Sequence, residues 1–427
     1  MSAILGGLGL PETRDSWRTL FGCGLLAMVG VPSLYGATFG LFMLPLQHSF
    51  GWSRGEVAFS LTLITLVGPA VVPFAGWVID NVRLRPLVLW GVVLQSANLA
   101  AFGLMGGNIW VYYGLVFTLM FTATGPSILT LAKVVQGWFN KSLGRAMGIL
   151  FACGAIGGII HPLWVQAVIT QVGWREAFLG MGALSLVIGG AAAWWFVHQA
   201  STKDAPHTCA APALEEVVAQ TPMSMVAFMS DPIWWKLALW NMLFAFGAGA
   251  IFMHYAALLQ DRGANPAQAA IAMSLLAAGG LVGNLAAGWL IDRWSAPRLA
   301  VALMLGPMLA ALVLYAGGVV GIAIGAGLVL GLCSGSDNSL SMFLARRYFH
   351  PGIFGQASAT QMIAATLGGG VSPWLSGLMY DRTGNYDVAL LMAAAAFGAA
   401  AVAAWRLPDS REAAQALQPQ VPKSVPS

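Results

Sequence analysis

The chain is poor in charged residues. Only 8% of its 427 residues are Asp, Glu, Lys or Arg, whereas 58% are hydrophobic. An ordinary soluble domain carries about a quarter charged residues, so this composition excludes a water-soluble globule and predicts an integral membrane protein. The net charge of +4 does not indicate nucleic-acid binding, because the basic residues lie in short clusters between apolar stretches.

Patterns that carry enzymatic or cofactor chemistry are also missing. The four cysteines have neither metal-ligand nor redox spacing, and the glycine cluster 368–370 has no phosphate-binding lysine beside it. No nucleophile, base and third polar group occur at a spacing that brings them together. We therefore expect no enzyme, no cofactor and no metal site.

Apolar stretches make up most of the chain. A helix needs roughly 20 residues to cross a hydrocarbon core of about 30 Å, and the stretches of that length lie at 19–46, 56–79, 86–105, 109–135, 143–168, 175–198, 234–259, 268–291, 298–318, 321–344, 354–378 and 386–405. Because lipid cannot satisfy exposed backbone groups, helices are expected. The sequence thus predicts an all-α integral membrane protein with twelve transmembrane helices in two six-helix repeats.

The expected organisation follows from the one extended polar stretch between these spans. It divides the chain into an N-terminal six-helix bundle at 1–198, a linker at 199–233, a C-terminal six-helix bundle at 234–405 and a tail at 406–427. All Lys and Arg residues lie on the side of the linker and both termini except Arg54, Arg175, Arg262 and Arg382. This asymmetry predicts a multi-pass protein of the cytoplasmic (inner) membrane with both termini, the linker and the tail in the cytoplasm.

The two halves repeat each other in sequence. GWVIDNVRLRP at 76–86 corresponds to GWLIDRWSAPR at 288–298, and the same offset of 212 residues carries Gly51 onto Gly263. A second correspondence, at an offset of 211, carries Gly173 onto Gly384. Repeated halves place a binding site at their interface, near the bilayer midplane, around which they can rock.

The repeated loops resemble those of the major facilitator superfamily, in which a pattern close to G-x-L-x-D-R-x-G-R-R follows the second helix. Its positions here are Gly76, Asp80, Arg83 and Arg85, and the second copy keeps Asp292 and Arg293. The resemblance implies a conformational latch that joins cytoplasmic helix ends in the outward-facing state. The alternative is that these charges only mark the membrane surface.

Three stretches look like those of the monocarboxylate transporter group and its bacterial relatives. They are FGWSRGEVAFS at 50–60, GWFNKSLGRAMGILFACGAIGG at 137–158 and the segment 345–386. The resemblance implies transport of a small organic anion, with a monocarboxylate as the first candidate. The arginine that relatives often carry in the eighth helix is absent from 268–291.

Two residues are candidates for proton coupling. Asp337 is the one acidic residue well inside a predicted span, and His161 precedes Pro162 in the fifth span. Ionisable groups at membrane depth are costly and usually functional. The alternatives are a structural carboxylate paired with a neighbouring helix, for instance with Arg346 or Lys133, and a histidine that only packs.

Candidates for substrate binding are the polar side chains Tyr35, His254, Asn284 and Gln361, all at membrane depth. Each of them has the alternative of simply joining helices by hydrogen bonds.

The predicted function is secondary active transport of a small organic anion by proton-coupled alternating access. The expected partners are this substrate, protons and the lipid bilayer, with no nucleic acid, and we expect a monomer. An exporter of hydrophobic drugs or metabolites and a non-transporting sensor remain the alternatives.

Overall fold

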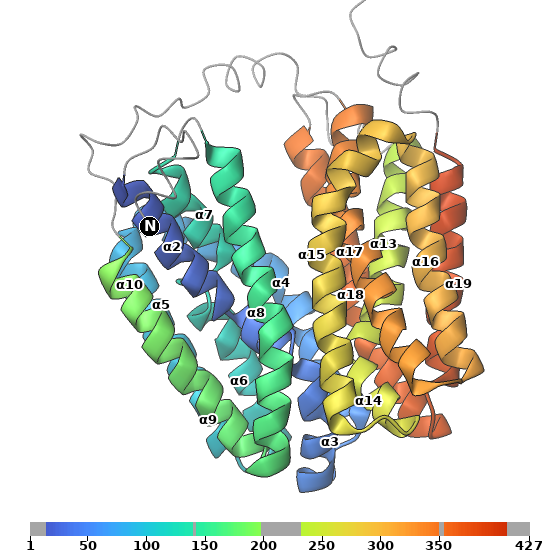
Figure 1. Cartoon of the computed structure of the whole chain (residues 1–427), viewed down its shortest axis with the longest axis horizontal. Coiled ribbons are helices and arrows are strands. Elements are labelled where there is room, and N and C mark those ends of the chain that lie inside the picture. Colours follow the sequence, from blue (N-terminus) through green and yellow to red (C-terminus); the bar gives the residue numbers. More distant parts are fainter. Residues whose placement is uncertain (1–13, 140–141, 198–231, 350–353, 408–427) are drawn as a thin grey trace, which may run out of the picture.

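The computed structural model describes residues 14–139, 142–197, 232–349 and 354–407. These residues form helices joined by short turns (Figure 1). Most of the predicted linker and nearly all of the predicted tail lie outside the described residues.

The N-terminal half, residues 14–197, contains six spans, several of them divided. Its helices are α2 (Arg14–Met28), η1 (Pro32–Gly36), α3 (Phe39–Phe50), α4 (Arg54–Asn81), α5 (Leu84–Leu104), α6 (Ile109–Thr122), α7 (Ile128–Gln136), α8 (Leu143–Gln171), α9 (Trp174–Leu184), η2 (Ser185–Gly189) and α10 (Gly190–Trp195).

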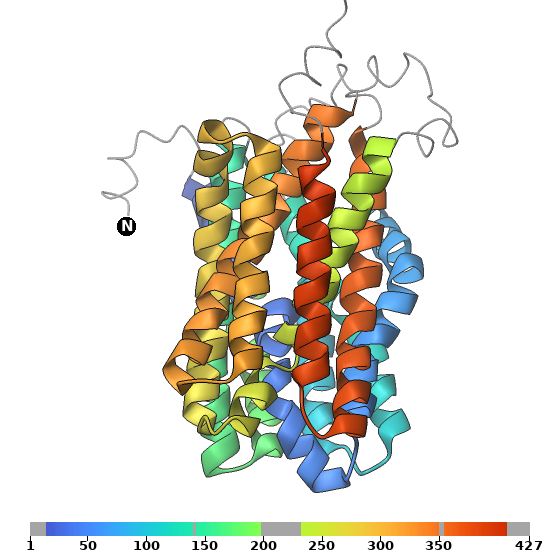
Figure 2. The same ribbon diagram turned by 90° about the vertical axis from the view of Figure 1, so that its right-hand side faces the viewer.

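The C-terminal half, residues 232–407, repeats this pattern, with α16 and α19 side by side on its outer face (Figure 2). Its helices are α13 (Pro232–Phe252), α14 (Tyr255–Asp261), α15 (Pro266–Arg293), α16 (Ala296–Ala316), α17 (Val320–Tyr348), α18 (Phe354–Thr383) and α19 (Asp387–Trp405).

The predicted twelve spans correspond to these helices. Nine helical segments of the described part are long and apolar enough to cross a membrane, counting α2 with η1 and α9 with η2 and α10 as one segment each, and α4, bent by 63° between Gly68 and Pro73, makes a tenth. The divided span α6–α7 and the helix α18 occupy the two remaining predicted positions.

The repeat is visible in the geometry of corresponding elements. Helices α4 and α15 each have 28 residues, and both begin with a capping box in which an N-cap side chain and the third helical residue bond each other's backbone N–H. Gly51 and Gly263 precede them with φ angles of 72° and 89°, a region in which glycine has no steric cost. The sequence offset of 212 residues thus relates equivalent helices.

Several predicted spans are broken where the sequence analysis expected continuous helices, and two of the breaks lie next to a proline. Helix α2 ends at Met28 and α6 ends at Thr122, each four residues before a proline, Pro32 and Pro126. A proline ring clashes with the carbonyl of the residue four positions earlier and donates no hydrogen bond, so each helix stops there.

The halves pack most extensively through two helix pairs, α4 with α18 and α8 with α15, and α3 also contacts α14. In the first pair the backbones approach closely, since a Cβ atom added to Gly377 would lie 2.6 Å from the Cα atom of Gly55. The end of the molecule where α4 begins is called the gate end below. The opposite end, where α2 begins and α19 ends, is called the terminal end (Figure 1).

Candidate functional site

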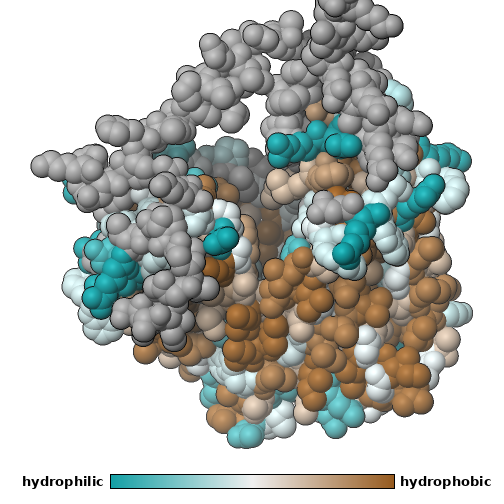
Figure 3. Space-filling view, turned by 45° about the horizontal axis from the view of Figure 1, so that its top comes forward, coloured by the Kyte–Doolittle hydropathy of each residue, from teal (hydrophilic) through white to brown (hydrophobic). Residues whose placement is uncertain are grey.

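A cavity of about 440 Å³ lies between the two halves. Seen from the terminal end, the surface is hollowed between them (Figure 3). The lining comes from the broken first and fourth spans, α8 and α15: Ala27, Gly30, Pro32, Ser33, Ala37, Pro126, Ile128, Phe151, Gly154, Ala155, Gly158, Ala277, Gly280, Leu281 and Asn284. This lining is mostly small or apolar, which is typical of a small-molecule site with few polar anchors.

Of the four predicted substrate-binding residues, Asn284 is the one in this lining. Its Oδ1 accepts a hydrogen bond of 3.3 Å from Ser339 Oγ of α17. The hydroxyl of Ser33 is bonded to the carbonyls of Ala27 and Gly154 at 3.0 and 2.8 Å. Asn284 is therefore a cavity-lining residue tied to α17, while the two bonds of Ser33 join the break after α2 to α8.

The other three predicted substrate-binding residues are buried in separate places. Tyr35 packs against Phe39 and Phe102 inside the N-terminal half. Gln361 of α18 accepts a 3.0 Å bond from Asn241 inside the C-terminal half. His254 lies at the break between α13 and α14 and is fully buried. The structure does not bring the four side chains together.

Asp337 lies inside the C-terminal half, where 5% of it is exposed. Among the described residues its Oδ1 has no hydrogen-bond partner. One turn along α17, Ser341 donates a 2.9 Å bond to Asn241 of α13, so polar groups of α13, α17 and α18 occur in this part of the bundle. The suggested pairing with Lys133 is not formed, since that amine bonds Asp80 at 2.7 Å.

His161 is held on both ring nitrogens. Trp164 Nε1 donates to its Nδ1 at 2.8 Å, and its Nε2 lies 2.9 Å from the carbonyl oxygen of Met28. Since a carbonyl only accepts, Nε2 carries the hydrogen and the neutral ring fits the site. The ring ties α8 to the end of α2.

The predicted latch residues lie near the terminal end. Asp80 pairs with Lys133 of α7, and Arg85 donates to the carbonyl of Trp194 at 3.1 Å, both within the N-terminal half. Arg83 is the exposed N-cap of α5, Gly76 has open space around it, and the guanidinium of Arg293 lies 3.8 Å from the Trp289 ring centroid. The side chain of Asp292 lies outside the described part.

A buried contact between the halves lies at the gate end, at Arg54. Its guanidinium bonds both carboxylate oxygens of Asp261, at 2.5 and 3.0 Å, and 3% of the residue is exposed. It also lies 3.7 Å from the ring centroid of Tyr380 and donates to Tyr386 Oη at 2.9 Å. A bidentate, stacked arginine of this kind is geometrically specific.

A second carboxylate crosses between the halves at the same place. Asp381 of α18 accepts the backbone N–H groups of Arg54 and Gly55, at 3.0 and 2.9 Å. These are the first two residues of α4, whose N–H groups have no partner within the helix. The C-terminal half thus caps a helix of the N-terminal half.

His254 extends this network into the C-terminal half. Its Nδ1 lies 3.0 Å from Tyr386 Oη, and its Nε2 lies 2.8 Å from the carbonyl oxygen of Pro373. We call Arg54, Asp261, Asp381, Tyr386 and His254 the gate. It closes the gate end, whereas the cavity is hollowed toward the terminal end.

Except for His254, the gate residues were not predicted as functional. Arg54 and Asp261 are separated by 207 residues, and Arg54 and Asp381 by 327. A signal was present, because Arg54 and Asp381 lie in two of the stretches that resemble the monocarboxylate transporter group, at 50–60 and 345–386. Both also lie next to span ends on the side with few charges.

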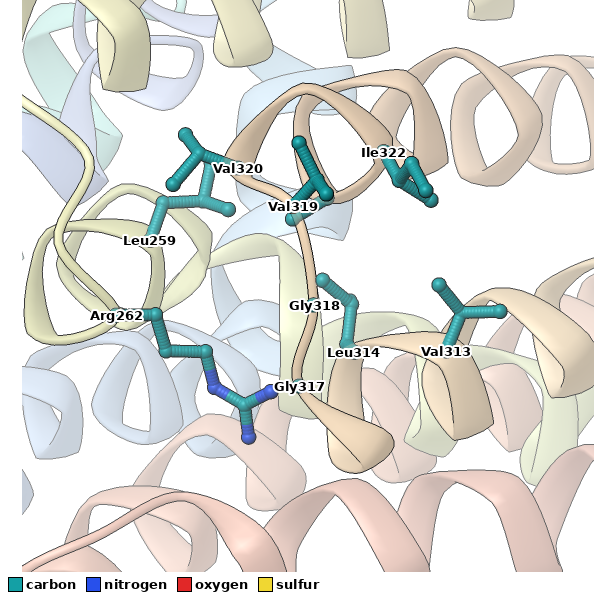
Figure 4. Close-up of a pocket in the computed structure, with 10 residues that line it drawn as sticks. Leu259, Arg262, Val313, Leu314, Gly317, Gly318, Val319, Val320 and Ile322 are labelled. Atoms are coloured by element: carbon teal, nitrogen blue, oxygen red, sulfur yellow. The ribbon is translucent and has the colours of Figure 1, made fainter.

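A smaller cavity of about 70 Å³ lies beside α14 and the turn between α16 and α17 (Figure 4). Its lining is apolar apart from Arg262, whose guanidinium bonds Asp387 at 3.0 Å. The one charged group in this described lining is therefore already paired within the C-terminal half.

Two similar six-helix bundles around a central cavity, closed at one end by bonds between the halves, define a membrane carrier. A family model described as Major Facilitator Superfamily matches residues 25–315 and 237–426. The chain belongs to the major facilitator superfamily and is a membrane transporter.

Three known proteins illustrate the range of similarity. Monocarboxylate transporter 11 of Mus musculus is 25% identical over 90% of this chain and 85% of its own length. The probable sulfoacetate transporter SauU of Cupriavidus necator is 24% identical over 84% of this chain and 86% of its own. The crystal structure of a mutant nucleoside transporter NupG has a TM-score of 0.73 at 13% identity, covering 90% of this chain and 98% of that one.

Proposed function

We propose that this transporter carries a small organic anion, with a monocarboxylate as the first candidate, together with a proton across the cytoplasmic membrane. The observation that carries the proposal is the central cavity, with one amide in an apolar lining, above a gate that joins the halves. Support for the substrate class comes from relatives named monocarboxylate and sulfoacetate transporters, which match over most of their length.

The proposed mechanism is alternating access. With both termini in the cytoplasm, the terminal end faces inward, and a cavity open there with a closed gate corresponds to the inward-facing state. Breaking the bonds of Arg54 with Asp261 and Asp381 opens the gate end, while the hollow at the terminal end closes. Rigid halves that rock around a central site perform this exchange.

Asn284 is the proposed anchor for the anion. Its Oδ1 accepts from Ser339, which leaves the amide N–H groups to donate to a carboxylate oxygen. The remaining lining, such as Phe151 and Leu281, excludes water and fits an apolar tail. Because no charged side chain occurs in the lining that the structure describes, an uncharged amphipathic cargo is a second candidate.

Asp337 is the proposed coupling residue. A buried carboxyl group with an unpaired oxygen is costly to keep charged. Taking up a proton removes this cost, and releasing it requires rearrangement of the surrounding helices. Asp337 therefore links proton binding to the packing of α17.

The direct test is uptake into proteoliposomes of labelled monocarboxylates, dicarboxylates, sulfonates and neutral aromatic compounds, with and without an inward proton gradient. We expect gradient-stimulated uptake of one monoanion class. Uptake of neutral compounds alone would contradict the proposal that the substrate is an anion. Uptake of an anion that the proton gradient does not stimulate would contradict proton coupling.

The coupling residue has its own test. We expect Asp337→Asn to abolish stimulation by the proton gradient, because the amide does not titrate, and Asp337→Glu to retain part of it. Size-exclusion profiles matching the parent protein establish folding of both variants. Unchanged gradient-driven uptake in Asp337→Asn contradicts the assignment.

A further inference from the structure

His254 is buried in a way that selects its neutral form. None of its surface is exposed, and both ring nitrogens are engaged, with Tyr386 Oη at 3.0 Å and the Pro373 carbonyl at 2.8 Å. Since the carbonyl only accepts, Nε2 carries the hydrogen and Nδ1 accepts from the tyrosine hydroxyl. A second ring hydrogen, on Nδ1, would point at the tyrosine oxygen, which already accepts from Arg54, and the tyrosine hydrogen would have to turn to the weak acceptor Met43 Sδ, 3.8 Å away.

The tyrosine that donates to His254 is itself part of the contact between the halves. Tyr386 Oη accepts from the guanidinium of Arg54 at 2.9 Å. One hydroxyl group thus separates the imidazole from a permanent positive charge. A proton added to His254 would turn the Nδ1 atom into a donor facing this hydroxyl and would place two cations close together in a buried site, which is unfavourable.

The other charged and titratable groups around the ring are already committed to the gate. Asp261 is bonded by Arg54 on both oxygens, and Asp381 accepts two backbone N–H groups at the start of α4. Tyr380 lies under the arginine. Neither carboxylate bonds His254 among the described contacts, so neither is positioned to pair with an imidazolium while the gate is closed.

We propose that His254 is a proton-binding site of the gate, vacant while the gate is closed and occupied when it is open. This inference rests on the alternating access proposed above and adds a second proton site to Asp337. An exposed imidazole titrates between about pH 5 and pH 8. Because the closed gate accepts only the neutral ring and the open gate accepts both forms, acid on the gate side shifts the population toward the open gate.

The experiment measures access to the gate from outside. Thr62 of α4 bonds the carbonyl of Gly370 across the halves at 2.7 Å and is 4% exposed. It lies eight residues from Arg54, about 12 Å along the helix. In a background without Cys23, Cys153, Cys209 and Cys333, a cysteine at position 62 reacts with an impermeant thiol reagent from the gate side when the gate opens.

The reaction of thiols itself depends on pH, so the rate is divided by that of a reference cysteine. Val172→Cys serves as the reference, since Val172 is 65% exposed at the end of α8. We expect the ratio for Thr62→Cys to rise several-fold between about pH 7.5 and pH 5.5, the range in which an exposed histidine titrates. With His254→Gln, whose amide both donates and accepts but does not titrate, the ratio stays constant.

An undiminished rise in the His254→Gln protein overturns the proposal, and so does a flat response with His254 present. If His254→Gln does not fold, Tyr386→Phe provides the test, because it removes the hydroxyl that links the ring to Arg54. A weaker pH response then supports the proposal, and a full response overturns it. Labelling needs no substrate, so a failure of the proposed anion transport appears separately, in the uptake panel.

Discussion

Arg54 makes more contacts between the halves than an isolated ion pair would. It contributes a guanidinium to Asp261 and Tyr386, a flat face to Tyr380, and its backbone N–H to Asp381. A lysine has the charge but neither the fork nor the flat face. The geometry of the arginine, beyond its charge, therefore holds the gate closed.

We expect Arg54→Lys to open the gate. A hydrogen bond to a charged group contributes about 1.5–3 kcal/mol, and each 1.4 kcal/mol is a factor of about ten, so labelling of Thr62→Cys from the gate side rises at least tenfold. The matched control is Arg262→Lys, because Arg262 bonds Asp387 within one half. Equal labelling of the two variants contradicts the role given to Arg54.

At the scale of single residues, the sequence predicted burial better than orientation. Burial of Asp337 and His254 followed from their positions in apolar spans, and both are indeed buried. That Asn284 faces the cavity while Gln361 bonds Asn241 depends on which side of a helix faces which neighbour. A helix that is apolar on every side carries no polar stripe to mark its outer face, so sequence alone does not orient it.

Helices α4 and α18 pack against each other across the halves, beginning at the gate. Gly377 lies against Gly55 at the gate end, and the Gly370 carbonyl accepts from Thr62 farther in. Absence of side chains at the first point lets the two backbones touch, which brings Asp381 within reach of the start of α4. The closed gate depends on this close approach.

Gly377→Ala is expected to favour the open gate. Its methyl group would lie 2.6 Å from the Cα atom of Gly55, a backbone atom that cannot turn away, so the closed arrangement is strained and the open one is not. We expect labelling of Thr62→Cys from the gate side to increase several-fold. Gly114→Ala is the control, because nothing lies within 4 Å of its added atom. If labelling in both variants equals that in the parent, close packing of α4 and α18 does not keep the gate closed.

At the scale of elements, hydropathy located the spans and missed their breaks. The sequence contained a signal for the ends of α2 and α6, because each helix ends four residues before a proline. The break at His254 has no proline near it and is accompanied by tertiary bonds to Tyr386 and Pro373. Such a break arises from packing between helices that are distant in sequence. Hydropathy averaged over neighbouring residues carries no information about that packing.

At the scale of the whole molecule, we expect the contacts at the gate end and those at the terminal end to stabilise different states. In this structure Asp80 bonds Lys133 of its own half, and the gate is closed. In its proposed latch role, Asp80 stabilises the other state, the outward-facing one, in which the terminal end is closed. The two sets of contacts then compete for one population.

Asp80→Asn is accordingly expected to favour the closed gate. Loss of the charged latch destabilises the outward-facing state, so labelling of Thr62→Cys from the gate side falls several-fold below the parent. Asp15→Asn is the control, since Asp15 pairs with Arg18 on an exposed helix end. Cysteine reactivity identical to the parent would count against the latch.

The start of α4 has two sets of acceptors, and this affects how easily the transporter cycles. Ser53 and Glu56 of the same half satisfy each other's backbone groups, while Asp381 of the other half accepts the two remaining N–H groups. In the proposed alternating access, water replaces Asp381 when the halves separate, and we expect the local capping box to keep the first turn of α4 wound. Opening then exchanges the Asp381 contacts for water without unwinding the helix, and we expect this to keep the free energies of the two proposed states within a few kcal/mol of each other.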